Sequence, residues 1–269
     1  MNSVSVIIPT YNRANFLLKA VQSVLHQTYP IAEIIICDDG SSDNSKELVL
    51  ALNSSKIIWL DCGKNGRPAI PRNKGIAKST GEWLAFLDDD DEWLPTKIEK
   101  QIALAEQEKV KAICCNAFKS IDGVIENNSY SLNTKERIKL GDLLKSNYVI
   151  CSSTLIHRTI IDKTEGFPVD ESLKALEDYA LWLRVSTLSD FAFVNESLVI
   201  YRDAPEQSIR GIGHDAQQQR KVIFKNLLSW VKRSNSVSKE SKALIVQELK
   251  ITRRTIVESF IRKQIRRFK

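Results

Sequence analysis

Short apolar runs alternate with helical patterns along the first 115 residues of the chain. The strands that we predict there are residues 3–9, 34–37, 57–60, 83–87 and 112–115. The helices that we predict between them are about residues 16–25, 44–52, 71 onward and 97–109. Alternating strands and helices predict an α/β fold with a mostly parallel central sheet and helices on both faces.

The second half of the chain carries further elements. We predict a hairpin turn at Asp122-Gly123, a strand at 152–157, a helix at 176–188, and a closing strand pair at 191–194 and 197–201. After a polar loop, apolar positions at 223–231 and 245–261 predict two C-terminal amphipathic helices. We therefore expect a main domain of residues 1–215 and a helical tail of residues 216–269.

Charge separates the predicted tail from the rest of the chain. Residues 216–269 hold 15 Lys and Arg against 3 Asp and Glu, whereas the remainder holds 24 against 30. A basic amphipathic tail on an acidic body favours peripheral contact with the anionic inner face of a membrane. A solvated basic face is the alternative. We expect no nucleic-acid partner.

Composition narrows the class of protein. With 43% hydrophobic and 27% charged residues, the chain is typical of a globular protein, and no apolar run approaches the ~20 residues of a membrane span. The N-terminus enters a strand pattern without the features of a secretory signal, so we expect a cytoplasmic location. The five cysteines lack C-x-x-C spacing and are expected to be reduced.

Polar clusters follow three of the predicted strands, at residues 10–12, 38–39 and 88–91. Because right-handed crossovers bring the carboxyl ends of parallel strands to one edge, these clusters should meet. Four adjacent aspartates repel one another unless a cation lies among them. Oxygen ligands on a turn suit Mg²⁺ or Mn²⁺ bridging to a phosphate, and a solvated acidic loop is the alternative.

Other side chains would complete a phosphate-bearing site. Tyr11 and Asp39 offer an aromatic wall and an acceptor for a nucleobase, and Arg67 and Arg72 would reach a diphosphate or the base. Asp178 begins a predicted helix, where the helix dipole favours a charged general base. Structural roles are the alternatives: a core aromatic for Tyr11, a turn cap for Asp39, a loop contact for Arg72 and a helix-start charge for Asp178.

Several motifs in order resemble the family 2 glycosyltransferases, which have the Rossmann-like GT-A fold. The resemblance extends from Val4 to about Arg202. The motifs are Pro9-Thr10-Tyr11-Asn12-Arg13, Cys37-Asp38-Asp39-Gly40-Ser41, Arg72-Asn73-Lys74-Gly75, Phe86-Leu87-Asp88-Asp89-Asp90-Asp91-Glu92-Trp93, Glu177-Asp178-Tyr179-Ala180-Leu181-Trp182-Leu183-Arg184 and Tyr201-Arg202.

The resemblance implies roles for individual residues. Asp90 would bind the metal, Mn²⁺ or Mg²⁺, although a fourth aspartate leaves the register open, so Asp89 and Asp91 stay candidates. Asp178 would act as the base, and Glu177 would orient the acceptor or support the helix start. The loop of residues 203–213 would cover the donor. The residues expected at the nucleotide sugar are Pro9, Tyr11, Asp39, Arg67, Arg72, Asp88 and Asp89.

The resemblance also implies a reaction. We expect an inverting, metal-dependent transfer of a hexose, glucose or galactose, from a UDP-sugar to a lipid-linked glycan. GlcNAc-diphosphoundecaprenol or lipopolysaccharide core would be the acceptor, in O-antigen or lipopolysaccharide biosynthesis. The absence of a Q-x-x-R-W motif favours single transfer. The alternatives are a non-catalytic sugar-nucleotide-binding module and a nucleotidyltransferase, whose Gly-rich phosphate loop is missing after the first strand.

Overall fold

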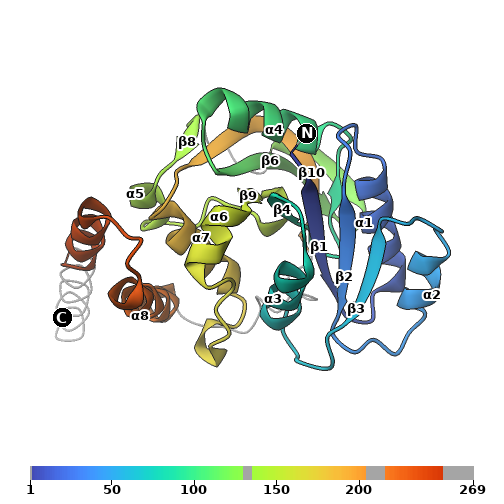
Figure 1. The fold of residues 1–269 in the computed structure, drawn as a ribbon, viewed down its shortest axis with the longest axis horizontal. Helices are drawn as coiled ribbons and strands as arrows, with labels where there is room; N and C mark the ends of the chain where they lie inside the picture. The colour runs from blue at the N-terminus through green and yellow to red at the C-terminus, as the bar shows by residue number, and fades with distance from the viewer. Residues whose placement is uncertain (1, 130–134, 204–215, 251–269) are drawn as a thin grey trace, which may run out of the picture.

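A ten-stranded sheet forms the centre of the protein in the computed structural model, which describes residues 2–129, 135–203 and 216–250 (Figure 1). Its main path runs β3-β2-β1-β4-β9-β6-β10-β5, with β7 beside β6 and β8 beside β10. The strands are β1 (Val4–Thr10), β2 (Glu33–Asp38), β3 (Ile57–Asp61), β4 (Trp83–Phe86), β5 (Glu92–Trp93), β6 (Ala112–Ile121), β7 (Val124–Ser129), β8 (Arg137–Ile138), β9 (Leu155–His157) and β10 (Phe191–Arg202).

The predicted α/β fold with a mostly parallel sheet is confirmed. Strands β1, β2, β3, β4, β6 and β10 run in one direction, and β9 lies antiparallel between β4 and β6. The helices are α1 (Ala14–Leu25), α2 (Ser45–Leu50), α3 (Ala69–Lys78), α4 (Lys97–Glu108), α5 (Leu140–Leu143), α6 (Arg158–Thr164), α7 (Glu177–Ser186) and α8 (Ala216–Arg233), with short 3-10 turns η1 (Cys151–Ser153) and η2 (Glu171–Leu173).

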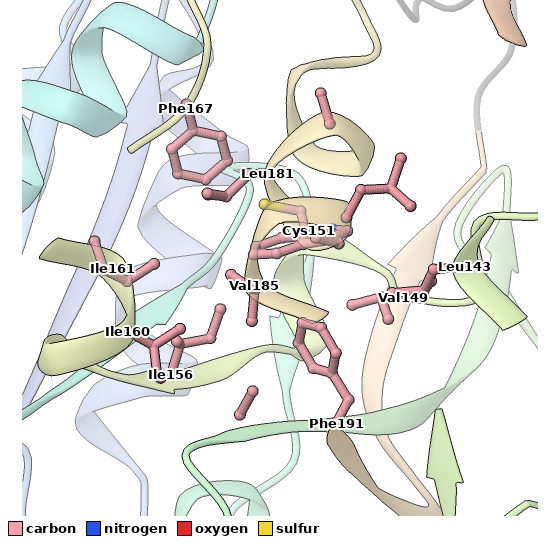
Figure 2. Packing of buried hydrophobic residues seen from close by; sticks show 14 of the residues in the cluster. Leu143, Val149, Cys151, Ile156, Ile160, Ile161, Phe167, Leu181, Val185 and Phe191 are labelled. Carbon is pink, nitrogen blue, oxygen red and sulfur yellow. The ribbon is translucent and has the colours of Figure 1, made fainter. Parts of the chain in front are cut away.

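Alternating side chains on the buried strands divide the core into two halves. Ile7 of β1 and Ile35 of β2 face one half, which α3, α5, α6, α7 and α8 cover. Val6 and Ile34 face the other half, beneath α1, α2 and α4. Figure 2 shows the first half, where side chains of α6 and α7 pack with Phe167 and Phe191. The sheet is therefore covered on both faces, as its apolar runs predict.

Two regions of the structure differ from the strands that the sequence predicts. The expected pair at 191–194 and 197–201 is one strand, β10, parallel to β6 along its length. The register shifts between Val194 and Ser197, where Asn195 and Glu196 are exposed, so the polar break in the pattern is a bulge rather than a turn. The strand expected at 152–157 begins only at Leu155, because η1 occupies residues 151–153.

The hairpin predicted at Asp122-Gly123 joins β6 to β7, and both turn residues have positive φ angles, of 49° and 81°. This is the backbone that a two-residue hairpin turn requires, and Asp-Gly adopts it readily.

Helix α8 packs against the α/β body. Phe224, Leu227 and Trp230 are buried in the same core half as α7, and residues 239–250 form a further helix. The predicted domain boundary near residue 215 lies outside the described residues, as do positions 251–261 of the last predicted helix, so the division into two domains stays a prediction. None of the described helices combines the length and apolar character needed to cross a bilayer.

Candidate functional site

The carboxyl ends of β1, β2 and β4 meet at one edge of the sheet. Thr10 pairs in register with Asp38, and Ile7 pairs with Phe86, so the three following loops start side by side. The Asp39 N–H also donates to the Thr10 carbonyl at 2.9 Å. The structure therefore brings the three predicted polar clusters together, at the edge where open α/β sheets bind ligands.

Two arginines neutralise part of the aspartate run. Arg13 Nη1 lies 3.2 Å from Asp89 Oδ1 and 2.5 Å from Asp90 Oδ2. Arg72 forms an ion pair with Asp88. Asp88 and Asp90 keep partly exposed carboxylates, whereas Asp89 and Asp91 are buried. The four neighbouring aspartates thus occupy different environments.

The buried carboxylates of the run, Asp89 and Asp91, accept hydrogen bonds that link neighbouring elements. Asp89 accepts a hydrogen bond from Thr10 Oγ1 at 2.8 Å. Asp91 accepts from Ser152 Oγ at 2.5 Å and from the Arg202 N–H at 2.8 Å. Both oxygens of Asp91 are therefore engaged, one by η1 and the other by the end of β10.

Crowding and burial disfavour charge on these carboxylates. Burial raises the pKa of Asp89 to about 7, against the opposing charge of Arg13. Burial and the neighbouring charge of Asp88 raise the pKa of Asp90, and burial raises that of Asp91. Such a site gains from an added cation, because a cation offsets the repulsion between carboxylates.

The residues fit a metal ion shared with a ligand rather than a closed protein cage. Across the described residues, no three His, Cys, Asp or Glu side chains gather to enclose an ion. Asp88 and Asp90 nevertheless offer partly exposed carboxylates on one turn. One or two carboxylates completed by substrate phosphates is the arrangement in which Mg²⁺ usually binds.

Arg72 connects the aspartate run to the start of α7. Its side chain is buried, with its guanidinium carbon 5.1 Å from the centroid of the Phe167 ring. Burial opposes its charge, but the nearby Cys151, Asp88 and Asp178 together raise the pKa of Arg72. The predicted base, Asp178, therefore lies within electrostatic reach of the same guanidinium that pairs with Asp88.

The first turn of α7 presents two carboxylates with different surroundings. Asp178 Oδ1 accepts a hydrogen bond from the Tyr179 N–H at 2.7 Å, and Asp178 is partly exposed. Glu177 is buried, and its Oε1 has no hydrogen-bond partner among the described residues. Burial raises the pKa of Glu177.

The residues expected around a nucleobase lie in different surroundings in the structure. Tyr11 is 43% exposed, so it is not a core aromatic, and Lys64 Nζ lies 5.8 Å from its ring centroid. Asp39 accepts from the Asn65 N–H and side-chain amide at 2.8 and 2.7 Å, and from the Gly66 N–H at 2.8 Å. Its carboxylate thus shapes the loop that carries Arg67. Pro9 is buried within β1.

Three contributors to the site had no assigned role in the sequence analysis. Arg13 lies in the first motif, so its position was visible, but its pairing with the aspartates depends on the tertiary fold. Thr10, also in the first motif, and Ser152, which no local pattern marks, donate to aspartates far along the chain. The predicted donor-covering loop extends outside the described residues, beyond Asp203.

Solved structures with the same architecture are glycosyltransferases. Staphylococcus aureus TarS in complex with UDP-GlcNAc matches with a TM-score of 0.73 at 16% identity, covering 92% of this chain and 71% of that chain. The mannosyltransferase PcManGT from Pyrobaculum calidifontis, in complex with GDP-Man and Mn²⁺, matches with a TM-score of 0.59 at 16% identity, covering 91% and 68%. The fold is GT-A.

Sequence comparison identifies the family. The model of glycosyl transferase family 2 matches residues 5–164. The UDP-Glc:alpha-D-GlcNAc-diphosphoundecaprenol beta-1,3-glucosyltransferase WfaP of Escherichia coli is 36% identical over 185 residues, 69% of this chain and 70% of that protein. WfgD of E. coli, with the same described activity, is 31% identical over 194 residues, 71% and 73% of the two chains. This chain belongs to glycosyl transferase family 2.

Proposed function

We propose that this protein transfers a hexose, glucose or galactose, from a UDP-sugar to a lipid-linked glycan, with inversion at the anomeric carbon. The observation that carries the proposal is that Arg72 forms an ion pair with Asp88 and lies within electrostatic reach of Asp178. A transferase needs a donor-side carboxylate and an acceptor-side base within one site. The relatives WfaP and WfgD, which act on GlcNAc-diphosphoundecaprenol, support an acceptor of that class.

The chemistry would use the partly exposed carboxylates. Asp178 removes the proton of an acceptor hydroxyl, and the hydroxyl oxygen of the acceptor attacks the anomeric carbon opposite the UDP group. The bond from that carbon to the diphosphate oxygen breaks, and UDP leaves with the electron pair. Asp88 and Asp90 would hold Mn²⁺ or Mg²⁺, which when bound supplies positive charge to the departing diphosphate.

The setting that we propose is bacterial surface-polysaccharide assembly, O-antigen or lipopolysaccharide, at the cytoplasmic face of the membrane. The named relatives act on lipid-linked substrates, and TuaG of Bacillus subtilis, described as a teichuronic acid biosynthesis glycosyltransferase, is 28% identical over 207 residues. The basic residues of 216–269 support peripheral contact with anionic lipid.

A donor and acceptor screen tests the proposal. The protein would be incubated with Mn²⁺ or Mg²⁺, with UDP-glucose or UDP-galactose, and with a GlcNAc-diphosphate-lipid acceptor. We expect UDP release that the acceptor stimulates, with the new linkage determined on the product. Binding of the UDP-sugar without turnover would instead identify a non-catalytic module.

A further inference from the structure

Ser152 contacts both ends of the aspartate run with one hydroxyl group. Its Oγ atom accepts a hydrogen bond from the Asp88 N–H at 3.0 Å and donates to Asp91 Oδ2 at 2.5 Å. A backbone hydrogen bond, from the Asp91 N–H to the Asp88 carbonyl at 3.1 Å, closes the same turn. The turn from Asp88 to Asp91 is therefore closed twice, once by its own backbone and once by a side chain of η1.

The segment that carries this hydroxyl is itself held by neighbouring elements. Ser152 and Ser153 are fully buried. Trp93 Nε1, from β5, donates to the Ser152 carbonyl at 2.7 Å, and Gln101 Nε2, from α4, donates to the Ser153 carbonyl at 2.7 Å. Two side chains thus fix consecutive carbonyls of η1, so the Ser152 hydroxyl has little freedom to move away from the turn.

The turn carries the two carboxylates that we propose as metal ligands. Asp88 and Asp90 are partly exposed, and each is paired with an arginine. Ser152 occupies neither carboxylate, because its contact with Asp88 is to the backbone N–H and its other contact is to the buried Asp91. Groups that orient metal ligands in this way are important for binding, and losing one typically costs about 10- to 100-fold in metal affinity or activity.

We propose that Ser152 is a positioning residue for the metal site, whose hydroxyl sets the conformation of the Asp88–Asp91 turn so that Asp88 and Asp90 can share an ion with the donor diphosphate. The inference rests on the proposed function, because it takes these two carboxylates as the metal ligands. In this role Ser152 acts through the turn and not on the substrate. Loss of its hydroxyl should therefore weaken metal binding and leave acceptor binding nearly unchanged.

Binding of Mn²⁺ in the presence of UDP tests this role, measured from the electron paramagnetic resonance signal of free Mn²⁺. Ser152→Ala removes the hydroxyl, and we expect the Kd for Mn²⁺ to rise at least about 10-fold. In transfer assays its kcat should fall, while the KM for the lipid-linked acceptor stays within a few-fold. Ser152→Cys keeps the shape of the side chain with a weaker donor and acceptor, and it should raise the same Kd by about 3-fold or more.

Ser153→Ala is the matched control. This neighbouring serine is equally buried, and its hydroxyl donates to the Ile150 carbonyl at 2.7 Å, within the same segment of the chain. Both alanine substitutions remove a buried hydrogen-bonding hydroxyl, so both should lower stability in urea. Only Ser152→Ala should also raise the Kd for Mn²⁺, because only that substitution removes a contact with the aspartate turn.

The inference and the proposed function fail in different ways. A Kd for Mn²⁺ that is unchanged in Ser152→Ala, or raised equally in Ser153→Ala, would show that Ser152 serves only the fold and would overturn the inference. Transfer by wild-type protein in excess EDTA would also overturn it, while the transferase function stands. Binding of Mn²⁺ and UDP without any transfer would reject the proposed function, and the same Kd comparison would still decide the role of Ser152. If Ser152→Ala does not fold by circular dichroism, Ser152→Cys decides, and a wild-type Kd in that variant overturns the inference.

Discussion

At the scale of single residues, four consecutive aspartates have separable tasks. Asp88 and Asp90 face the two arginines with partly exposed carboxylates, whereas Asp91 accepts two hydrogen bonds deep in the protein. The turn after β4 points neighbouring side chains in different directions, so the acidic run is not one uniform binding surface. Substitutions along it should therefore change different properties.

Removing the Asp91 carboxylate should reduce stability. Asp91→Ala leaves Ser152 Oγ and the Arg202 N–H without their acceptor, and we expect the free energy of unfolding to fall by about 2–4 kcal/mol. Asp90→Ala, the matched substitution, should change it by less than about 1 kcal/mol, because that ion pair is partly exposed. Urea unfolding of both variants measures the difference; equal losses would contradict it.

The Asp90→Ala variant also tests whether Asp90 binds the metal ion. We expect Mn²⁺ to increase the affinity of the wild-type protein for the UDP-sugar. Asp90→Ala should reduce that increase by at least about 10-fold, since it removes a proposed metal ligand. Calorimetric titration with and without Mn²⁺ measures this. An unchanged metal dependence in Asp90→Ala would move the ligand to another carboxylate of the run.

Asp178→Asn should abolish transfer but keep the UDP-sugar affinity within a few-fold. The amide cannot take a proton from the acceptor hydroxyl, whereas the donor is held elsewhere. Asp162→Asn, an exposed carboxylate on α6, serves as the control. Transfer at the wild-type rate in Asp178→Asn would reject the assignment of the base.

The meeting of the polar clusters could be predicted from the sequence, because strand periodicity and crossover handedness place them at one edge. The hydrogen-bond and ion-pair partners of each carboxylate could not be predicted from the sequence. Arg13, Ser152 and Asn65 reach their aspartates through the folded chain, across intervals of 26 to 77 residues. Such pairings depend on packing, which periodicity does not encode.

At the scale of elements, helix α4 buries the lysine at its first position. Lys97 is fully buried, donates to Gln101 Oε1 at 2.9 Å and lies 4.0 Å from the centroid of the Trp93 ring. Burial lowers the pKa of Lys97 to about 8. Ile98 and Ile102 of the same helix are buried, as apolar residues at helical spacing favour. A lysine at a helix start is expected in solvent, so the sequence pattern alone could not show this contact.

The pH dependence of this lysine has a definite sign. The ordinary pKa of 10.5 exceeds the folded value of about 8, so the unfolded chain binds more protons between these pH values. Stability therefore rises with pH across this window, relative to a variant without the lysine. From pH 7 to 10.5, the free energy of unfolding of wild type should gain on the order of 3 kcal/mol over that of Lys97→Met.

Urea unfolding at pH 7, 8.5 and 10 tests this sign. Lys100→Met, on the exposed side of the same helix, is the control and should show no such gain, because Lys100 pairs with Glu196 at the surface. A difference between wild type and Lys97→Met that stays constant with pH would show that Lys97 keeps its ordinary pKa in the folded protein.

At the scale of the whole molecule, the predicted tail begins as part of the body. Ile223, Phe224, Leu227 and Trp230 of α8 are buried in the core, so removing the chain after residue 213 would expose apolar surface. Its amphipathic pattern was visible in the sequence. The sequence did not show which surface covers the apolar side of α8, because a membrane and the neighbouring α7 would both satisfy the same amphipathic pattern.

A shorter truncation separates membrane contact from folding. Ending the chain after Lys250 keeps α8 and removes seven basic residues and one acidic residue. We expect unchanged thermal stability within a few degrees, less sedimentation with anionic vesicles, and a larger loss of activity on long-chain lipid acceptors than on short ones. Neutral vesicles are the control. If sedimentation with anionic vesicles does not change, residues 251–269 do not carry the contact.

The hydrogen bonds of Asp39 have a consequence for protein engineering. The Asp39 carboxylate, directly after β2, fastens Asn65 and Gly66, and the Cys62 N–H donates to the Asp38 carbonyl at 2.8 Å. The segment of residues 61–68 is thus held at the end of β2 and continues into α3. Chimeras that exchange this segment between transferases should fold when the recipient retains an aspartate at the position of Asp39. The exchange would then transfer Arg67 together with the rest of the segment, without redesign of the sheet.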